Sequence, residues 1–148
     1  VGDRLGEANV LQAMGDVQAF RKENDTALDS YAQALTLFRA VGARLGEANV
    51  LAALSRIAVA EGRLDEAEAQ LAKIIETRRA IGSLYNEGAD YGNFAIVLLN
   101  NGYPQKAGQY ARLARDIFAQ IDLPALVEMM GRIVILSEQQ GGGGVTVV

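Results

Sequence analysis

Residues 1–11, VGDRLGEANVL, return forty positions later as VGARLGEANVL at residues 41–51. The two stretches differ at one position, where Ala43 stands in place of Asp3. A near-identical stretch at a fixed spacing is typical of proteins built from repeated structural units, each of which buries its apolar face against the next. The repetition therefore decides which fold class to expect.

The forty-residue period continues beyond the second copy. The first position of each unit is aliphatic, and a glutamate six residues later also recurs. These positions are Val1, Val41, Ile81 and Ile121, with Glu7, Glu47 and Glu87. We therefore expect an array over residues 1–140, divided into repeats 1–40, 41–80 and 81–120 and a terminal helix at 121–140. Residues 141–148 form a Gly-rich tail that ends in Val-Thr-Val-Val.

Within each unit the apolar residues follow a helical spacing, as Leu51, Leu54 and Ile57 do in the second unit. Turn-forming residues interrupt each unit in its middle and at its end, for example at EGRLD and AIGSL. Glycines suit helix ends and prolines suit helix starts at three of these breaks, where the residues are Gly62, Gly102, Pro104 and Pro124. The sequence thus predicts an all-α fold of about seven helices, arranged as three antiparallel pairs and a final helix.

Two positions in each unit hold small residues, twelve residues apart. They are Gly15 and Ala27, Ser55 and Ala67, and Ala95 and Ala107. Small side chains at these points let the axes of paired helices approach closely. In the first unit they belong to a longer pattern, formed by Leu11, Met14, Gly15 and Gln18 and then by Ala27, Tyr31 and Ala34. This pattern resembles the tetratricopeptide repeat.

The resemblance covers residues 1 to about 140 and implies a right-handed solenoid. The usual tetratricopeptide period is about 34 residues, so the forty-residue unit is similar to a long-repeat subclass found in eukaryotic polarity adaptors and bacterial signalling proteins. A HEAT-type array, with a period of about 40 to 47 residues, is the structural alternative. The placement of Gly15 and Ala27 favours the tetratricopeptide repeat.

The composition excludes several classes of function. Lys and Arg number 14 against 18 Asp and Glu, and the net charge of −4 leaves no basic surplus for nucleic acid. The chain has no Cys and no His, so the usual nucleophiles, imidazole bases and zinc ligands are missing. We therefore expect no catalytic residue, no metal and no cofactor. Because the sequence shows no apolar run of about 20 residues and no secretion signal, we expect a cytoplasmic protein that does not enter the membrane.

The recurring charged residues have structural explanations. The glutamate at the seventh position of each unit stands early in a predicted helix, where a negative charge interacts favourably with the helix dipole. Arg39, Arg78 and Arg79 stand near the ends of predicted helices. We expect these arginines to be solvated and to satisfy the last carbonyl groups of those helices.

The resemblance implies that the first helix of each pair lines a concave groove. The residues that this mapping places in the groove are Asn9, Gln12, Asp16 and Phe20, then Asn49, Arg56 and Val59, then Asn93, Ile96 and Asn100, and finally Met129 and Arg132. Asn offers one donor group and one acceptor group, which suits the backbone of an extended peptide. The same polar residues are also compatible with ordinary solvated surface. Relatives that grip chaperone tails use a set of Lys, Asn and Arg, and the matching positions here, Gln12, Asp16, Ala53, Ala89 and Asn93, lack that set.

These observations favour a non-catalytic scaffold for protein–protein interaction that binds an extended peptide segment in the concave groove. The alternative is a self-associating or regulatory repeat segment, excised from a larger bacterial signalling protein, whose ends stack on further repeats. Its support is the stretch MMGRIVIL at residues 129–136, which is apolar on nearly every side, as expected when another helix covers it.

The tail suggests a separate hypothesis, namely that it acts as a ligand. Residues 145–148 favour an extended conformation, and we expect them to contact the groove of this chain or of another copy near Asn49, Asn93 or Arg132. A terminal Val with Thr two places before it also resembles a ligand of PDZ domains. A cloning remnant is the third alternative.

Overall fold

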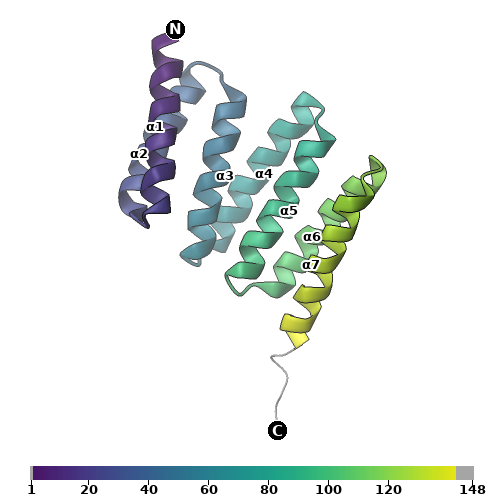
Figure 1. Cartoon of the computed structure of the whole chain (residues 1–148). Helices are drawn as coiled ribbons and strands as arrows, with labels where there is room; N and C mark the ends of the chain where they lie inside the picture. The colour runs from purple at the N-terminus through teal and green to yellow at the C-terminus, as the bar shows by residue number, and fades with distance from the viewer. Residues whose placement is uncertain (1, 143–148) are drawn as a thin grey trace. The chain divides into compact units, whose positions relative to one another are not determined.

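The computed structural model describes residues 2–142, and in this part of the chain all regular structure is helical (Figure 1). The helices are α1 (Gly2–Phe20), α2 (Asn24–Ala40), α3 (Arg44–Ala60), α4 (Leu64–Ile81), α5 (Leu84–Asn100), α6 (Pro104–Gln120) and α7 (Pro124–Gly142). These seven helices, joined by tight turns, confirm the predicted all-α class, a solenoid of helix repeats. The predicted contact of residues 145–148 with the groove lies outside the described residues.

The turns between helices share one conformation. A residue with a left-handed φ, between 57° and 85°, stands at every twentieth position: Lys22, Gly42, Gly62, Gly82, Gly102 and Asp122. The next amide donates a hydrogen bond to the carbonyl five residues earlier, as Ala43 does to Phe38 and Tyr103 does to Leu98, both at 2.9 Å. This bond satisfies carbonyls that the end of a helix leaves free. Because four of the six positions are glycine, most of the turns adopt the left-handed conformation without steric cost.

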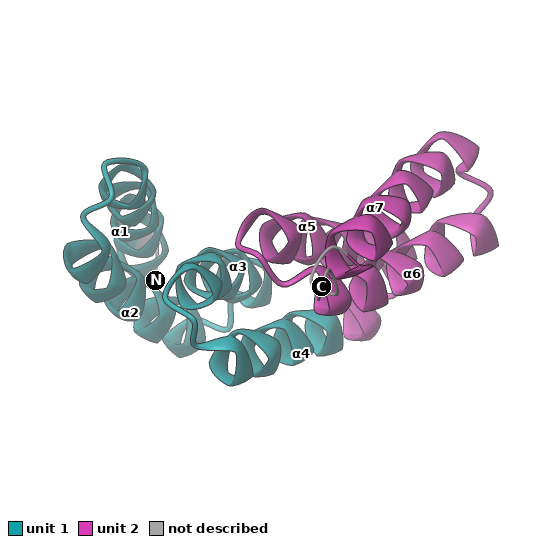
Figure 2. Ribbon diagram, turned by 90° about the horizontal axis from the view of Figure 1, so that it is seen from below, with its two compact units in different colours: residues 1–77 teal, residues 78–148 magenta. Residues whose placement is uncertain are grey.

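The chain divides into two compact units, Val1–Thr77 and Arg78–Val148, which Figure 2 shows in teal and magenta. The boundary falls inside α4, so the last turn of that helix belongs to the second unit. Each unit has buried clusters of its own, described in turn below.

In the first unit, α1 and α2 pair through small residues and one aromatic ring. A Cβ added at Gly15 would lie 2.6 Å from a ring carbon of Tyr31, too close for real atoms. Ala27, which follows Gly15 by twelve residues, is fully buried. In the second repeat Ser55 and Ala67 are buried as well, so the burial expected of these small positions is confirmed.

A second aromatic ring joins α2 to α3. The Phe38 ring lies against Gly46, where the Cβ of any other residue would collide with it. Phe38, Val50 and Ile57 share one buried cluster with Ala34. This contact holds the second helix of one repeat against the first helix of the next.

The second unit repeats this type of packing. A Cβ at Gly88 on α5 would lie 2.9 Å from the ring of Phe118 on α6. Met130 of α7 places its sulfur 3.0 Å from the corresponding point of Gly92. The cluster around Phe118 and Met130 is completed by small and aliphatic residues, which are Ala95, Ala111, Ala114, Ile133 and Val134.

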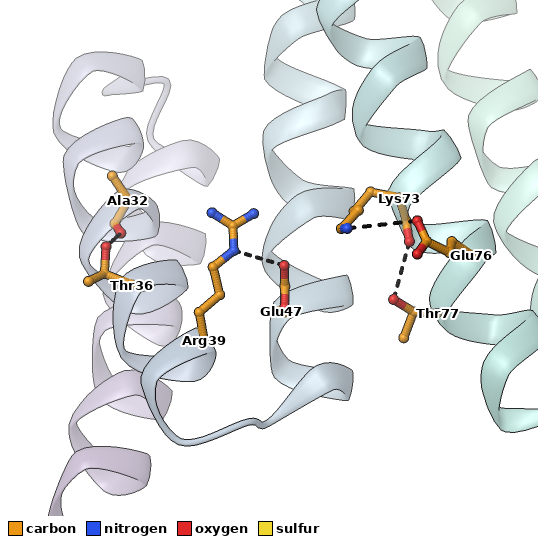
Figure 3. A network of polar contacts seen from close by, with 7 residues as sticks. All are labelled: Ala32, Thr36, Arg39, Glu47, Lys73, Glu76 and Thr77. Carbon is orange, nitrogen blue, oxygen red and sulfur yellow. Dashed lines mark hydrogen bonds and ion pairs between the residues drawn. The ribbon is translucent and has the colours of Figure 1, made fainter.

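Three arginines near helix ends form ion pairs, which corrects the expectation that they would satisfy the last carbonyls. Arg39 Nε lies 2.8 Å from Glu47 Oε1 (Figure 3), and Arg79 binds Glu87 at the same distance forty residues later. Arg78 pairs with Asp90 at 2.7 Å. The recurring glutamates therefore have a structural role in the second and third copies, where each fastens its helix to the preceding one.

We predict opposite effects for alanine at two glycines that share one repeat position. Gly46→Ala puts a Cβ into the Phe38 ring, and we expect a net loss of about 1 to 2 kcal/mol, because overpacking exceeds the helix propensity gained. Gly6→Ala meets open space and should stabilise the chain by up to about 1 kcal/mol. Urea denaturation of both variants checks this, and a stabilised Gly46→Ala would show that the Phe38 contact is not close.

Candidate functional site

The predicted groove residues lie on the first helix of each pair and on α7, and most are exposed. In the first unit Asn9, Asp16, Asn49 and Arg56 are exposed and Gln12 is half-buried. In the second unit Asn93, Asn100 and Arg132 are exposed, and Ile96 is half-buried. Phe20 and Met129 are also exposed, whereas Val59 is buried in the interior and was wrongly assigned to the groove. The remaining positions are open to a ligand.

Two asparagines mark equivalent points of the first unit. Asn9 and Asn49 are separated by one repeat, and both side chains are exposed. The residues just before them, Ala8 and Ala48, are fully buried. Because successive residues on a helix point about 100° apart, burial of the alanines directs the neighbouring amide groups to one edge of the buried face. Each amide offers both a donor and an acceptor there.

Asp16 is held by a hydrogen bond that the sequence analysis missed. The Tyr31 hydroxyl donates to Asp16 Oδ1 at 2.6 Å. Burial raises the pKa of Tyr31 strongly, and the bond to Asp16 and the charge of Asp16 raise it further, whereas the nearby Arg56 lowers it. Asp16 and Arg56 occupy the same position in successive repeats, and both were predicted to lie in the groove. In the structure both interact with the buried side chain of Tyr31. The sequence contained one sign of this hydrogen bond, because a tyrosine stands in the first repeat where the later repeats have Leu71 and Ala111.

In the second unit Arg132 has a partner on its own helix. Its guanidinium lies 2.6 Å from Glu128 Oε1, one turn earlier, and both side chains are mostly exposed. A pair of this kind contributes little to stability and opens readily. A carboxylate ligand therefore has to compete with Glu128 for Arg132.

Three aromatic residues of α5 and α6 pack against one another in the second unit, a contact that the sequence did not predict. Phe94 meets Tyr110 edge to face with ring centroids 4.9 Å apart, and Tyr91 stacks on Tyr110 at 6.0 Å. Burial raises the pKa of Tyr91, Arg79 lowers it and Glu87 raises it. Ile96 packs against the cluster that contains Met130. Asn93, Ile96 and Asn100 follow a helical spacing of three and four, which places them along one stripe of α5.

A separate polar cleft of about 410 Å³ lies between α6 and α7. Its walls include Gln105, Gln109 and Ser137, and an ion pair between Arg112 and Glu138 at 3.1 Å. None of the predicted groove residues lies in it. Within residues 2–142 there is no group of three or more acidic side chains placed to hold a metal ion. No helix in the same range is both long enough and apolar enough to cross a membrane.

The fold and the exposed first helices together define a helical-repeat protein. A family model described as tetratricopeptide repeat matches residues 6–80, which are 75 of the 148 residues. The chain belongs to the tetratricopeptide repeat family, whose members typically act as non-catalytic scaffolds for interactions between proteins. A comparison with curated proteins found no match.

The Tyr31 site predicts a loss of stability at alkaline pH. An unfolded tyrosine ionises near pH 10, whereas the raised pKa keeps the folded Tyr31 protonated above that pH. The unfolded state thus releases a proton that the folded state retains, so the free energy of unfolding falls as the pH rises above about 10. Tyr31→Phe should cost about 1 kcal/mol at pH 8 through the lost hydrogen bond and should lose less stability than wild type between pH 8 and pH 11.

Chemical denaturation at the two pH values measures both effects. Tyr85→Phe, which removes the hydroxyl of an exposed tyrosine, is the matched control. An equal pH dependence in wild type and Tyr31→Phe would contradict the assignment.

Proposed function

We propose that this chain is a non-catalytic cytoplasmic scaffold that binds an extended peptide segment of a partner protein on the exposed faces of its first helices. In the first unit that face contains Asn9, Gln12, Asp16, Asn49 and Arg56, and in the second it contains Asn93, Ile96, Asn100 and Arg132. Membership of the tetratricopeptide family supports the scaffold role in general. The peptide mode of binding rests on the side chains themselves.

The observation that carries the proposal is the repeated, exposed amide at Asn9 and Asn49. An extended peptide has backbone donors and acceptors that no internal hydrogen bond satisfies. Amides at equivalent points of neighbouring repeats bind such a backbone without regard to its side chains. Affinity then comes from the backbone, and selectivity comes from the charged and apolar groups nearby.

Those nearby groups differ between the two units. In the first unit Arg56 has no ion pair with another described residue, while Asp16 accepts the hydrogen bond of Tyr31. An acidic peptide side chain suits Arg56, because a charge-assisted hydrogen bond is roughly twice as strong as a neutral one. In the second unit the half-buried Ile96 stands between two asparagines and favours an apolar side chain. We therefore propose that the first unit favours an acidic side chain of the ligand and that the second unit favours an apolar one.

Selection of peptides from a random phage-displayed library on the folded chain tests the proposal. Selected peptides should bind Asn49→Ala/Arg56→Glu at least about ten-fold more weakly than wild type, since one neutral and one charged hydrogen bond are lost. The matched control is Lys73→Glu, which makes the same charge change at an exposed position of α4. Fluorescence anisotropy measures the affinities. Peptides that bind both variants as tightly as wild type would place the site elsewhere.

A second candidate function is self-association, and α7 provides the observation that favours it. Met129, Ile135 and Leu136 are each more than two-fifths exposed on this helix, which leaves an unusual amount of apolar surface in water. Under this hypothesis wild type forms dimers or larger species at high concentration, and Ile135→Lys shifts it toward the monomer. Light scattering over a range of concentrations measures this. A wild-type chain that stays monomeric throughout would contradict self-association.

A further inference from the structure

Helix α3 exposes one narrow stripe of its surface. Apart from Arg44 at its start, its exposed residues are Leu45, Asn49, Arg56 and Ala60. Successive residues of a helix point about 100° apart, so these four fall within an arc of about 60°. The residues that flank the arc on its two sides are buried, and they are Ala48, Ser55, Val50 and Ile57. The stripe is therefore the part of α3 that a ligand can reach.

Helix α1 carries a matching stripe forty residues earlier. Its residues there are Leu5, Asn9 and Asp16, and all three are exposed. Leu5 is 41% exposed and Leu45 is 55% exposed, so the copy on α3 is the more open of the two. Exposure of the leucine is thus a property of the repeat position. On both helices the stripe runs from a leucine through an amide to a charged group.

The two stripes lie side by side in the first unit. Helices α1 and α3 run in the same direction, because each is antiparallel to α2, and they are in contact (Figure 1). Leucine therefore lies beside leucine, asparagine beside asparagine, and Asp16 beside Arg56. The interactions of Tyr31 agree with this placement, since its hydroxyl donates to Asp16 while the charge of Arg56 acts on the same phenol.

The charges of Asp16 and Arg56 are opposite, and neither side chain forms an ion pair with another described residue. The hydrogen bond from Tyr31 uses only Oδ1 of Asp16, so the second carboxylate oxygen is able to accept another donor. The guanidinium of Arg56 offers several N–H donors. One end of the paired stripes thus presents a negative group and a positive group to a ligand.

We propose that the first unit binds an extended segment in which a basic residue and an acidic residue flank an apolar one. This inference rests on the proposed peptide groove. The backbone of the segment lies over the two asparagines, and its apolar side chain turns toward the two leucines. The basic side chain pairs with Asp16, and the acidic side chain pairs with Arg56.

The spacing of the groups fits an extended chain. Neighbouring side chains of such a chain point in opposite directions, and alternate ones are about 7 Å apart. Two charged side chains with one residue between them thus point to the same side, and their length lets them reach two packed helices whose axes are about 8–10 Å apart. On each helix the leucine stands about 6 Å before the asparagine and the charged residue about 10 Å after it. A backbone at the level of the asparagines therefore directs its apolar residue one way and its charged residues the other.

Four labelled peptides with Gly-Ser flanks test this pattern. Two have mixed cores, Leu-Lys-Leu-Glu-Leu and Leu-Glu-Leu-Lys-Leu, because a ligand can cross the helices in either direction. The dibasic core is Leu-Lys-Leu-Lys-Leu, and the diacidic core is Leu-Glu-Leu-Glu-Leu. In fluorescence anisotropy at low ionic strength, one mixed core should bind wild type about five-fold or more tightly than either like-charged core, since the latter exchange an attraction for a repulsion.

Arg56→Glu should move the preference to the dibasic core by a similar factor, because both charged positions then attract Lys. The variant keeps the hydrogen bond between Tyr31 and Asp16, so the fold is retained. Lys73→Glu, which makes the same charge change at an exposed position of α4, is the matched control and should leave the ranking of the four peptides as in wild type. An unchanged ranking in Arg56→Glu overturns the proposal.

The apolar part of the pattern has its own variant. Leu45→Ser should weaken the preferred mixed core about three-fold or more, because the apolar contact is lost. Leu113→Ser removes a leucine that is 45% exposed on α6, outside the groove, and should bind as wild type does. Equal affinity of wild type and Leu45→Ser would show that the ligand does not contact the leucines.

The phage-selected peptides separate this proposal from the groove itself. If none of the four cores binds, or if their ranking ignores the charges, while the selected peptides still lose affinity on Asn49→Ala, the pattern is wrong and the groove stands. Selected peptides that bind Asn49→Ala as tightly as wild type contradict the groove and the pattern together.

Discussion

The packing of this chain depends on aromatic rings that lie over glycines of neighbouring helices. Tyr31 covers Gly15, Phe38 covers Gly46 and Phe118 covers Gly88. In each case a single methyl group on the glycine would enter the ring, so the distance between two helix axes is set by a missing side chain. Because interiors are close-packed, the small alanines nearby and the aliphatic clusters follow from that distance. The buried side of each first helix then determines which of its residues face the solvent.

At the turns, too, contacts between helices outweigh the conformational preference of the individual residue. A left-handed residue appears at every twentieth position, whether that residue is one of the four glycines or is Lys22 or Asp122. A side chain in this conformation carries a steric cost of roughly 1 kcal/mol or more, which the flanking helix contacts offset at both of these turns. The regular spacing of helices thus persists where the turn residue does not favour it. The turn chemistry assists the fold but does not determine it.

The sequence predicted the period, the seven helices and the burial of the small positions, because each of these follows from spacing along one chain. It did not predict which side chains meet across a turn. Arg39 was expected to satisfy carbonyls of its own helix and instead reaches Glu47, and the hydrogen bond that the Tyr31 hydroxyl donates to Asp16 was not expected. Val59 was placed on the groove face, yet it is fully buried. Such contacts depend on the rotation of one helix against the next, which changes the neighbours of a residue without changing the apolar period.

Helices α1 and α3 show how strongly the burial of a residue depends on the neighbouring helix. Val10 and Val50 stand in nearly identical stretches of sequence, yet one is more than half exposed and the other is fully buried. Local sequence therefore specifies the chemistry of a face, while the neighbouring helix decides whether that face is interior or surface. On α1 the bare apolar side and the amide of Asn9 are adjacent in sequence but point about 100° apart around the helix axis. The exposed apolar side of α1 and the amide of the proposed groove are therefore different surfaces of the same helix, set by different residues of one nearly repeated stretch.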